Sequence, residues 1–141
     1  EAEMADSKVA FELVSPERLV VSMPVDMVVV PGGEGDFGVL PGHAPLIASV
    51  RPGVIEVYEG REVSDRIFVA GGFAEVTGER CTVLAESAVR VADIDVGDAE
   101  SDLRTAESDF ASASSDNDRA DAERRIGVAQ GKIDAVRRSS H

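Results

Sequence analysis

The sequence predicts an all-β N-terminal sandwich of eight to ten strands over residues 4–92, followed by a C-terminal antiparallel α-helical hairpin over residues 93–141. Three observations support this division. All six prolines and ten of the thirteen glycines precede residue 92, as expected where turns join many short strands. Apolar residues alternate with period two in the first part. In the last 49 residues, which contain no proline, they recur at spacings of three and four.

The first part reads as a series of short strands bounded by turn formers. Val9, Phe11 and Leu13 alternate with more polar neighbours, so one face of this strand is expected to be buried. Further β-branched or apolar runs predict strands over residues 19–21, 25–30, 45–50, 54–58, 63–70, 73–77, 81–85 and 88–91. Pro24 is expected to separate the second strand from the third. This number of strands at this spacing is typical of a sandwich or barrel.

The second part reads as two helices with matching apolar seams. The first seam comprises Val96, Ala99, Leu103, Ala106, Phe110 and Ala113, and the second comprises Ala122, Ile126, Ala129, Ile133 and Val136. Asp95 is the expected N-cap of the first helix, and Asn117 or Asp118 that of the second. The short polar connection implies that the helices are antiparallel.

The charges of the two helices are opposite. Residues 93–113 carry seven acids and one base, whereas residues 119–138 carry three acids and six bases. The helices should attract one another, although exposed ion pairs contribute only about 0–1 kcal/mol each. An alanine-rich seam buries little apolar area, and Gly127 and Gly131 each cost about 1 kcal/mol of helix propensity. We therefore predict a marginal hairpin that can detach, open or fray.

The overall composition excludes several classes of function. A net charge of −13 argues against binding to nucleic acid or to an anionic membrane surface. The single cysteine, Cys81, excludes an internal disulfide framework, fits a reducing compartment, and is expected to be a small core residue. No run approaches the ~20 apolar residues of a membrane span, and we expect no signal peptide. Met4 is the expected start of the native chain.

Residues 34–53 are the stretch most expected to meet a partner. Their glycines and prolines prevent a helix and predict a rigid, tightly turned loop that presents Glu34 and Asp36 at one end. Residues 33–38 also fit the GxGxxG pattern of dinucleotide-binding turns. That pattern must open a helix, which Pro41 and Pro45 forbid, and the two acids would repel a pyrophosphate, so the glycines are interpreted as structural.

No set of residues predicts catalysis or metal binding. His43 is the only internal histidine, and the chain has neither a GxSxG elbow nor a GxxxxGK[ST] loop. One cysteine and one internal histidine are too few for a zinc site. His43 either hydrogen-bonds within its own turn or contacts a partner. Glu34 and Asp36 are the only acidic pair on the rigid loop, and without aromatic platforms they do not resemble a sugar-cleaving dyad.

Several motifs resemble the epsilon subunit of bacterial F-type ATP synthases, whose mitochondrial counterpart is called delta. They are Glu34-Gly35-Asp36-Phe37-Gly38, Pro41-Gly42-His43-Ala44-Pro45, Arg51-Pro52-Gly53 and Gly71-Gly72-Phe73-Ala74-Glu75-Val76. The order of strands and hairpin is also similar. The resemblance implies a non-catalytic central-stalk subunit of the proton-translocating enzyme, which couples the gamma subunit to the c-ring. It implies a peripheral location on the cytoplasmic face of the bacterial inner membrane, reached only through the complex.

The resemblance also implies which residues bind partners. Glu34, Asp36 and His43 would contact the polar loops of the c-ring, the alternative being a solvated acidic turn. In an extended inhibitory state, basic residues of the second helix would meet the alpha and beta catalytic subunits and inhibit ATP hydrolysis. These are Arg119, Arg124, Arg125, Lys132, Arg137 and Arg138. The alternative for them is pairing with the acidic first helix.

A nucleotide-binding motif of some epsilon subunits, Ile-Asp-x-x-Arg-Ala, is incomplete here. Ile94, Asp95 and Ala99 stand where the resemblance places them, but Asp98 replaces the arginine. A carboxylate there repels phosphate oxygens, so ATP binding is expected to be weak or absent, and no other cofactor is expected. The rival reading is a stand-alone β-sandwich ligand-binding module or enzyme with a helical tail, which would need a deep pocket lined by polar groups.

Overall fold

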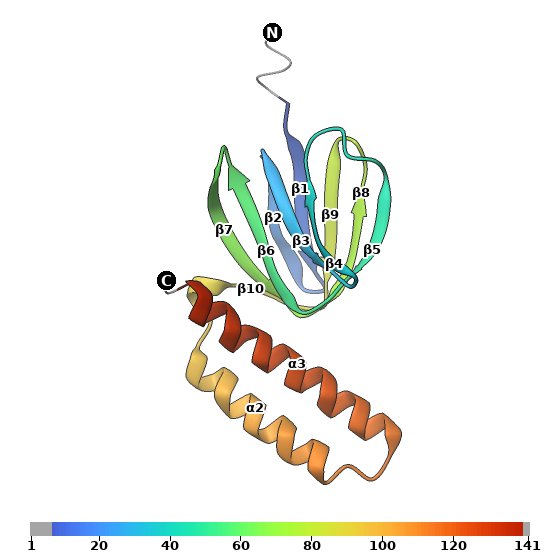
Figure 1. Ribbon diagram of the computed structural model, residues 1–141, viewed down its shortest axis with the longest axis vertical. Helices are drawn as coiled ribbons and strands as arrows, with labels where there is room; N and C mark the ends of the chain where they lie inside the picture. Colours follow the sequence, from blue (N-terminus) through green and yellow to red (C-terminus); the bar gives the residue numbers. More distant parts are fainter. Residues whose placement is uncertain (1–6, 140–141) are drawn as a thin grey trace. The chain divides into compact units, whose positions relative to one another are not determined.

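The computed structural model describes residues 7–139, which form two compact units, residues 7–90 and residues 91–139. The expected start at Met4 lies outside the described residues. The first unit contains only strands and turns, and the second contains a 3₁₀ turn and two α-helices (Figure 1). The predicted fold class, an all-β sandwich followed by a helical hairpin, is confirmed.

The first unit consists of ten strands. They are β1 (Val9–Ser15), β2 (Arg18–Val25), β3 (Met27–Gly32), β4 (Gly35–Val39), β5 (Leu46–Val50), β6 (Gly53–Glu59), β7 (Glu62–Val69), β8 (Gly72–Val76), β9 (Arg80–Ala85) and β10 (Ala88–Arg90). Neighbouring strands follow the order β10-β7-β6-β3-β5-β8-β9-β1-β2, and β4 pairs with the free side of β3.

Strand β3 joins the two layers of the sandwich because it changes partner along its length. Its first residues, Met27 to Val29, pair with β6, while its last residue, Gly32, pairs with Val50 of β5. One layer therefore contains β4, β3, β6, β7 and β10, and the other contains β5, β8, β9, β1 and β2. All pairs are antiparallel except β1 with β9.

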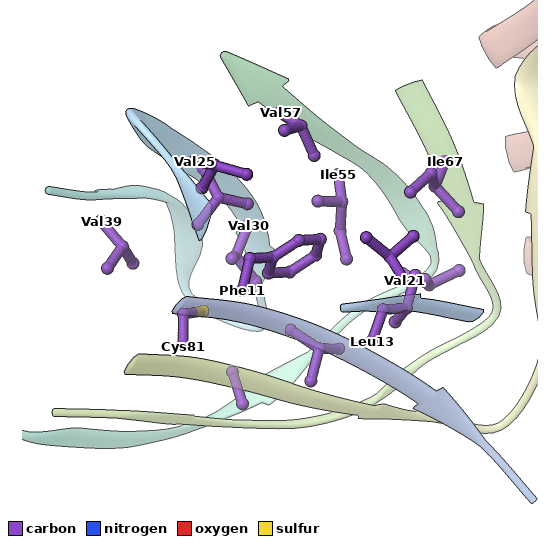
Figure 2. Close-up of a cluster of buried hydrophobic side chains, with 14 of the residues drawn as sticks. Phe11, Leu13, Val21, Val25, Val30, Val39, Ile55, Val57, Ile67 and Cys81 are labelled. Carbon is purple, nitrogen blue, oxygen red and sulfur yellow. The ribbon is translucent and has the colours of Figure 1, made fainter. Parts of the chain in front are cut away.

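The core between the layers is mainly aliphatic, with Phe11 as a buried aromatic side chain within it. Phe11 and Leu13 of β1 point toward side chains of β3 and β6, with Phe11 beside Val30 and Ile55 (Figure 2). Both β1 residues are fully buried, and burying a side chain of this size contributes about 1.5–3 kcal/mol. Cys81 is also part of this cluster, as expected for a small core residue.

Two local expectations for the β unit were wrong. Pro24 lies within β2 instead of separating two strands, and the chain reverses direction at Asp26. Proline is tolerated there because β2 ends the strand order and one of its sides has no ladder to complete. Residues 35–39, expected to be loop, form β4, because Gly35 at φ 138° lets the chain fold back onto β3.

The second unit contains η1 (Val91–Asp93), α2 (Val96–Ala111) and α3 (Asp116–Ser139). Asp95 caps α2 as predicted, because its side chain accepts a 3.1 Å hydrogen bond from the Asp98 N–H. The predicted cap of α3 was wrong. The Oγ of Ser115 accepts from the Asp118 N–H at 3.1 Å, so the helix begins before Asn117.

The two helices lie antiparallel and side by side (Figure 1). Small residues dominate the buried seam, which comprises Ala99, Ala106, Ala122, Ala129 and Ile133. In residues 91–139, the ion pair between the helices is Arg125 with Asp109, at 3.0 Å. The other arginine pairs lie within α3, so the opposite helix charges produce less attraction than the sequence suggests. No helix within residues 7–139 is long and apolar enough to cross a membrane.

Candidate functional site

The acidic turn, residues 32–36, connects β3 to β4 and is fastened by Arg51. The Nη2 of Arg51 donates to Asp36 Oδ1 at 2.6 Å, and its Nη1 donates to the carbonyl of Gly32. The backbone N–H of Arg51 also donates to Pro31 at 2.9 Å, and that of Gly33 to Ser49 at 2.9 Å. The predicted rigidity of this region therefore has a structural source, namely the turn after β5 that carries Arg51.

Glu34 differs from Asp36 in its surroundings. Its carboxylate has no hydrogen bond or ion pair to any residue within 7–139. It borders an open hollow of about 370 Å³ between the acidic turn and β5. The hollow is lined by Gly32, Gly33, Glu34, Gly35, Phe37, Leu46, Ile47, Ala48 and Ser49. A carboxylate at the rim of a partly apolar hollow is suited to a basic partner side chain, not to bond chemistry.

The structure places His43 apart from the two acids, at the other end of β4. Strand β4 is five residues long, or roughly 16 Å at the usual rise of ~3.3 Å per residue, and Asp36 lies near its start while His43 lies beyond its end. Gly42 donates to the carbonyl of Gly78 at 2.7 Å, which holds this loop against the β8–β9 turn. The Nδ1 of His43 lies 2.7 Å from the carbonyl of Ala44, so Nδ1 must be the donor.

A second surface, which the sequence reasoning did not identify, lies on the outer face of the layer that contains β5, β8, β9, β1 and β2. Cross-strand pairing aligns Leu19 with Val14, Val14 with Leu84, and Leu84 with Phe73. Ile47 lies on the same face, two residues from the pairing partner of Phe73. We call these five residues the apolar row. The exposed fraction is 58% for Leu19, 56% for Leu84, 62% for Phe73 and 75% for Ile47.

The sequence contains only a weak signal for the apolar row. In β9, Cys81, Val83 and Ala85 face the core, so Leu84 is an apolar residue in a position where alternation predicts a polar one. Such an exception in one strand is common and has no meaning by itself. Leu84 becomes informative only through the register between strands. That register aligns four outward-facing apolar residues across four neighbouring strands. Contiguous exposed apolar side chains mark an interaction surface.

The basic residues of α3 are largely engaged within the hairpin. Arg119 pairs with Asp116, Arg124 with Asp121, and Arg125 with both Asp109 and Asp121. Lys132 is half-buried, and Arg137 and Arg138 are exposed in the last turn of α3. Pairing with the acidic first helix is therefore seen for Arg125, whereas Arg119 and Arg124 pair within α3. Contact of the six basic residues with a partner subunit stays a prediction.

The incomplete nucleotide motif lies at the start of α2. The side chain of Asp95 is already used as the helix cap, and Ala99 is buried in the helix seam. Asp98 is exposed in the first turn. Thus Asp95 and Ala99 have structural roles in the hairpin.

Cys81 is shielded from solvent. Burial raises the pKa of its thiol to about 12, because the thiolate would lose its hydration. Within residues 7–139, no group of three or more potential ligands is placed to hold a metal ion.

Comparisons with known proteins agree with this architecture. Residues 8–91 match the family model described as ATP synthase, Delta/Epsilon chain, beta-sandwich domain. The ATP synthase epsilon chain of Paramagnetospirillum magneticum is 54% identical over 129 residues, which are 92% of this chain and 97% of that one. The epsilon chain of Rhodospirillum centenum is 71% identical over 87 residues, 60% of this chain. This match spans 59% of the Rhodospirillum centenum chain, and a second match spans 61% of the Rhodospirillum rubrum epsilon chain. This chain therefore aligns with about three fifths of the length of these two relatives.

Solved structures show the same fold at low sequence identity. A chain of the Euglena gracilis mitochondrial ATP synthase, OSCP/F1/c-ring, superposes with a TM-score of 0.78 at 21% identity, covering 96% of this chain and 82% of that one. A chain of the Tetrahymena thermophila mitochondrial ATP synthase central stalk/c-ring structure superposes with a TM-score of 0.64 at 12% identity, covering 92% of this chain and 96% of that one.

The β unit is therefore a delta/epsilon-type β-sandwich domain of ATP synthase. The relative matched over nearly its full length extends this conclusion beyond the sandwich. The chain belongs to the family of ATP synthase epsilon chains, which are non-catalytic subunits of that enzyme. The resemblance inferred from the loop motifs and the absence of a catalytic role are confirmed.

Proposed function

We propose that this chain is a rotor subunit of the central stalk, which couples the gamma subunit to the c-ring of a proton-translocating ATP synthase. Family membership supports the complex, and the apolar row supports a permanent partner within it. The apolar row is the observation that carries the proposal, because leaving such side chains in water is costly. The chain would then lie at the cytoplasmic face of the bacterial inner membrane, held there only by the complex.

The apolar row is the proposed docking face for the gamma subunit. It belongs to five strands of one layer and is flanked by acidic Glu12 and Glu75, which suits an apolar interface with a polar rim. Phe73 follows Gly72, which pairs with Val50, the neighbour of Arg51. The row and the acidic turn therefore lie at the same end of the β unit. One rigid sandwich can hold two partners there at once, as torque transmission requires.

The acidic turn is the proposed contact with the c-ring. The turn that carries Glu34 and Asp36 is braced by hydrogen bonds and would meet basic side chains on the polar loops of the ring. His43 lies at the far end of β4, so we assign it no part in this contact. The c-ring contact that the resemblance implies for His43 stays a prediction, separate from the contact proposed for the acidic turn.

The hairpin is the proposed regulatory element. Its seam is built mainly from alanines, and the ion pair between Arg125 and Asp109 is exposed, so few interactions oppose opening. A two-state element with a small free-energy gap shifts easily when a partner binds one state better. In the open state, the basic residues of α3 would contact the alpha and beta catalytic subunits and inhibit ATP hydrolysis.

ATP binding is proposed to be weak or absent. The carboxylate of Asp98 stands where the resembling motif has arginine, and Asp95 is occupied as a cap. Calorimetric titration of the full chain with ATP should show no binding in the low micromolar range, whereas Asp98→Arg should bind ATP more tightly. A low micromolar dissociation constant for the unaltered chain would contradict this.

Substitution of Leu84 tests the gamma contact. Leu84→Ser should weaken binding to the purified gamma subunit by about tenfold or more, because a buried leucine contributes about 1.5–3 kcal/mol. Leu40→Ser is the matched control, since Leu40 is 55% exposed and Leu84 56%, but Leu40 lies in the loop after β4. Native affinity in Leu84→Ser, or an equal loss in Leu40→Ser, would refute the assignment of the apolar row.

A further inference from the structure

The two carboxylates of the acidic turn are in different electrostatic states. Asp36 Oδ1 lies 2.6 Å from Arg51 Nη2, within the range of a charge-assisted hydrogen bond. The carboxylate of Glu34 has no such partner within residues 7–139. A basic side chain that approaches this turn therefore meets one carboxylate already paired and one unpaired.

Arg51 does more than neutralise Asp36. Its planar guanidinium binds Asp36 with one nitrogen and the carbonyl of Gly32 with another, so it spans the base of the turn. The backbone N–H of Arg51 donates to the carbonyl of Pro31, and the neighbouring Val50 pairs with Gly32. The side chain thus fixes the end of β3 and the start of β4 relative to the turn after β5.

Glu34 lies beside the hollow between the acidic turn and β5, where Phe37 and Ile47 supply apolar walls. Lysine and arginine side chains place an aliphatic stem on apolar surface and keep their charged end at a polar group. The hollow offers both surfaces, with the carboxylate of Glu34 at its rim. Asp36 has its nearer oxygen directed to Arg51 instead.

We propose that Glu34 alone supplies the docking charge of the acidic turn for a lysine or arginine of the partner, and that Arg51 is a positioning residue which withdraws Asp36 and holds the turn in shape. This inference rests on the proposed c-ring contact. It assigns different roles to the two acids, which the sequence alone treats as equivalent.

The first test compares neutral variants of the two acids. The full chain, bound to its gamma subunit, is titrated against detergent-solubilised c-rings. Glu34→Gln should weaken binding about tenfold, as expected for a hydrogen bond to a charged group, whereas Asp36→Asn should weaken it less than threefold. Glu62→Gln is the control, because Glu62 is an exposed acid at the β6–β7 turn. It should bind like the native chain.

The second test addresses Arg51. Arg51→Gln should speed hydrogen exchange of the Gly33 amide about tenfold, since that amide bonds Ser49 within the braced region. Without Arg51, the carboxylate of Asp36 is free to face the partner. Adding Asp36→Asn to Arg51→Gln should therefore weaken c-ring binding more than fivefold. Arg66→Gln is the control, since its pair with Glu56 lies on β6 and β7.

The possible outcomes separate the inference from the proposed function. If Asp36→Asn weakens binding as much as Glu34→Gln, the inference fails while the c-ring contact stands. If neither variant changes binding, the proposed contact itself fails. Unchanged exchange of Gly33 in Arg51→Gln, or an Asp36→Asn effect that does not depend on Arg51, would overturn the positioning role.

Discussion

Gly72 shows how one residue fixes the join between β5, β8 and β9. Its φ is 145°, in a region that favours glycine, and it pairs with both Val50 and Ala85. A Cβ at this position would lie 2.0 Å from the carbonyl oxygen of Leu84, which is backbone and cannot move aside cheaply. The gap between the strands predicted over residues 63–70 and 73–77 therefore contains a point of close backbone approach.

We expect Gly72→Ala to destabilise the β unit far more than Gly60→Ala. Gly60 also has a positive φ, of 64°, but an added Cβ there meets nothing within 4 Å. Gly60→Ala should cost about 1–2 kcal/mol from backbone strain alone. Thermal melting of both variants measures the difference, and equal melting temperatures would contradict the close approach at Gly72.

Other residue-level features explain what the sequence could and could not predict. The Asp95 cap was predictable because an N-cap acts on its own following residues. The cap of α3 was not predictable, because each of four consecutive residues can cap a helix, namely Ser115, Asp116, Asn117 and Asp118. The pairing of Arg51 with Asp36 joins residues fifteen positions apart and depends on how β3 and β5 meet.

At the scale of elements, turn residues and periodicity predicted most strands because these signals are local. Strand β4 was not predicted because its glycines are typical of a loop. Its pairing with β3 uses backbone groups, which leave no pattern in the side chains. The apolar row was missed because it exists only after four strands take their register. The proposed docking face is thus a property of strand register, which the sequence does not display directly.

The helical hairpin should lose stability in acid partly through Asp121. Hydrogen bonds from Arg124, and then from Arg125, lower the pKa of Asp121 below its ordinary value of 3.8. The ionised form is therefore favoured by folding, and its contribution is complete above the unfolded value and disappears as pH falls through the lower folded value. Asp121→Asn should lower hairpin stability at neutral pH and change little in strong acid.

Circular dichroism at a helical wavelength, recorded during melting at pH 7 and at about pH 2.5, measures this effect. Glu123→Gln is the control, because Glu123 is exposed on the same helix and has no hydrogen bond or ion pair within residues 7–139. If the difference between Asp121→Asn and the native chain is the same at both pH values, the ion pairs of Asp121 do not stabilise the hairpin.

At the scale of the whole molecule, the β unit should fold without the hairpin. Its core cluster contains residues from β1 to β10 only, so removal of the helices takes nothing from it. A chain that ends at residue 92 should melt cooperatively and bind the gamma subunit within about twofold of the full chain, because the apolar row remains complete. An unfolded product would refute the division into two domains.

The most direct measurement of the central claim is energy coupling in the assembled enzyme. ATP synthase depleted of this chain is placed in lipid vesicles, and ATP-driven proton uptake is recorded with and without the purified chain. The rotor role predicts that uptake is lost on depletion, returns with the native chain, and returns poorly with Leu84→Ser. Full proton uptake in the depleted enzyme, or restoration by Leu84→Ser as complete as by the native chain, would contradict the account.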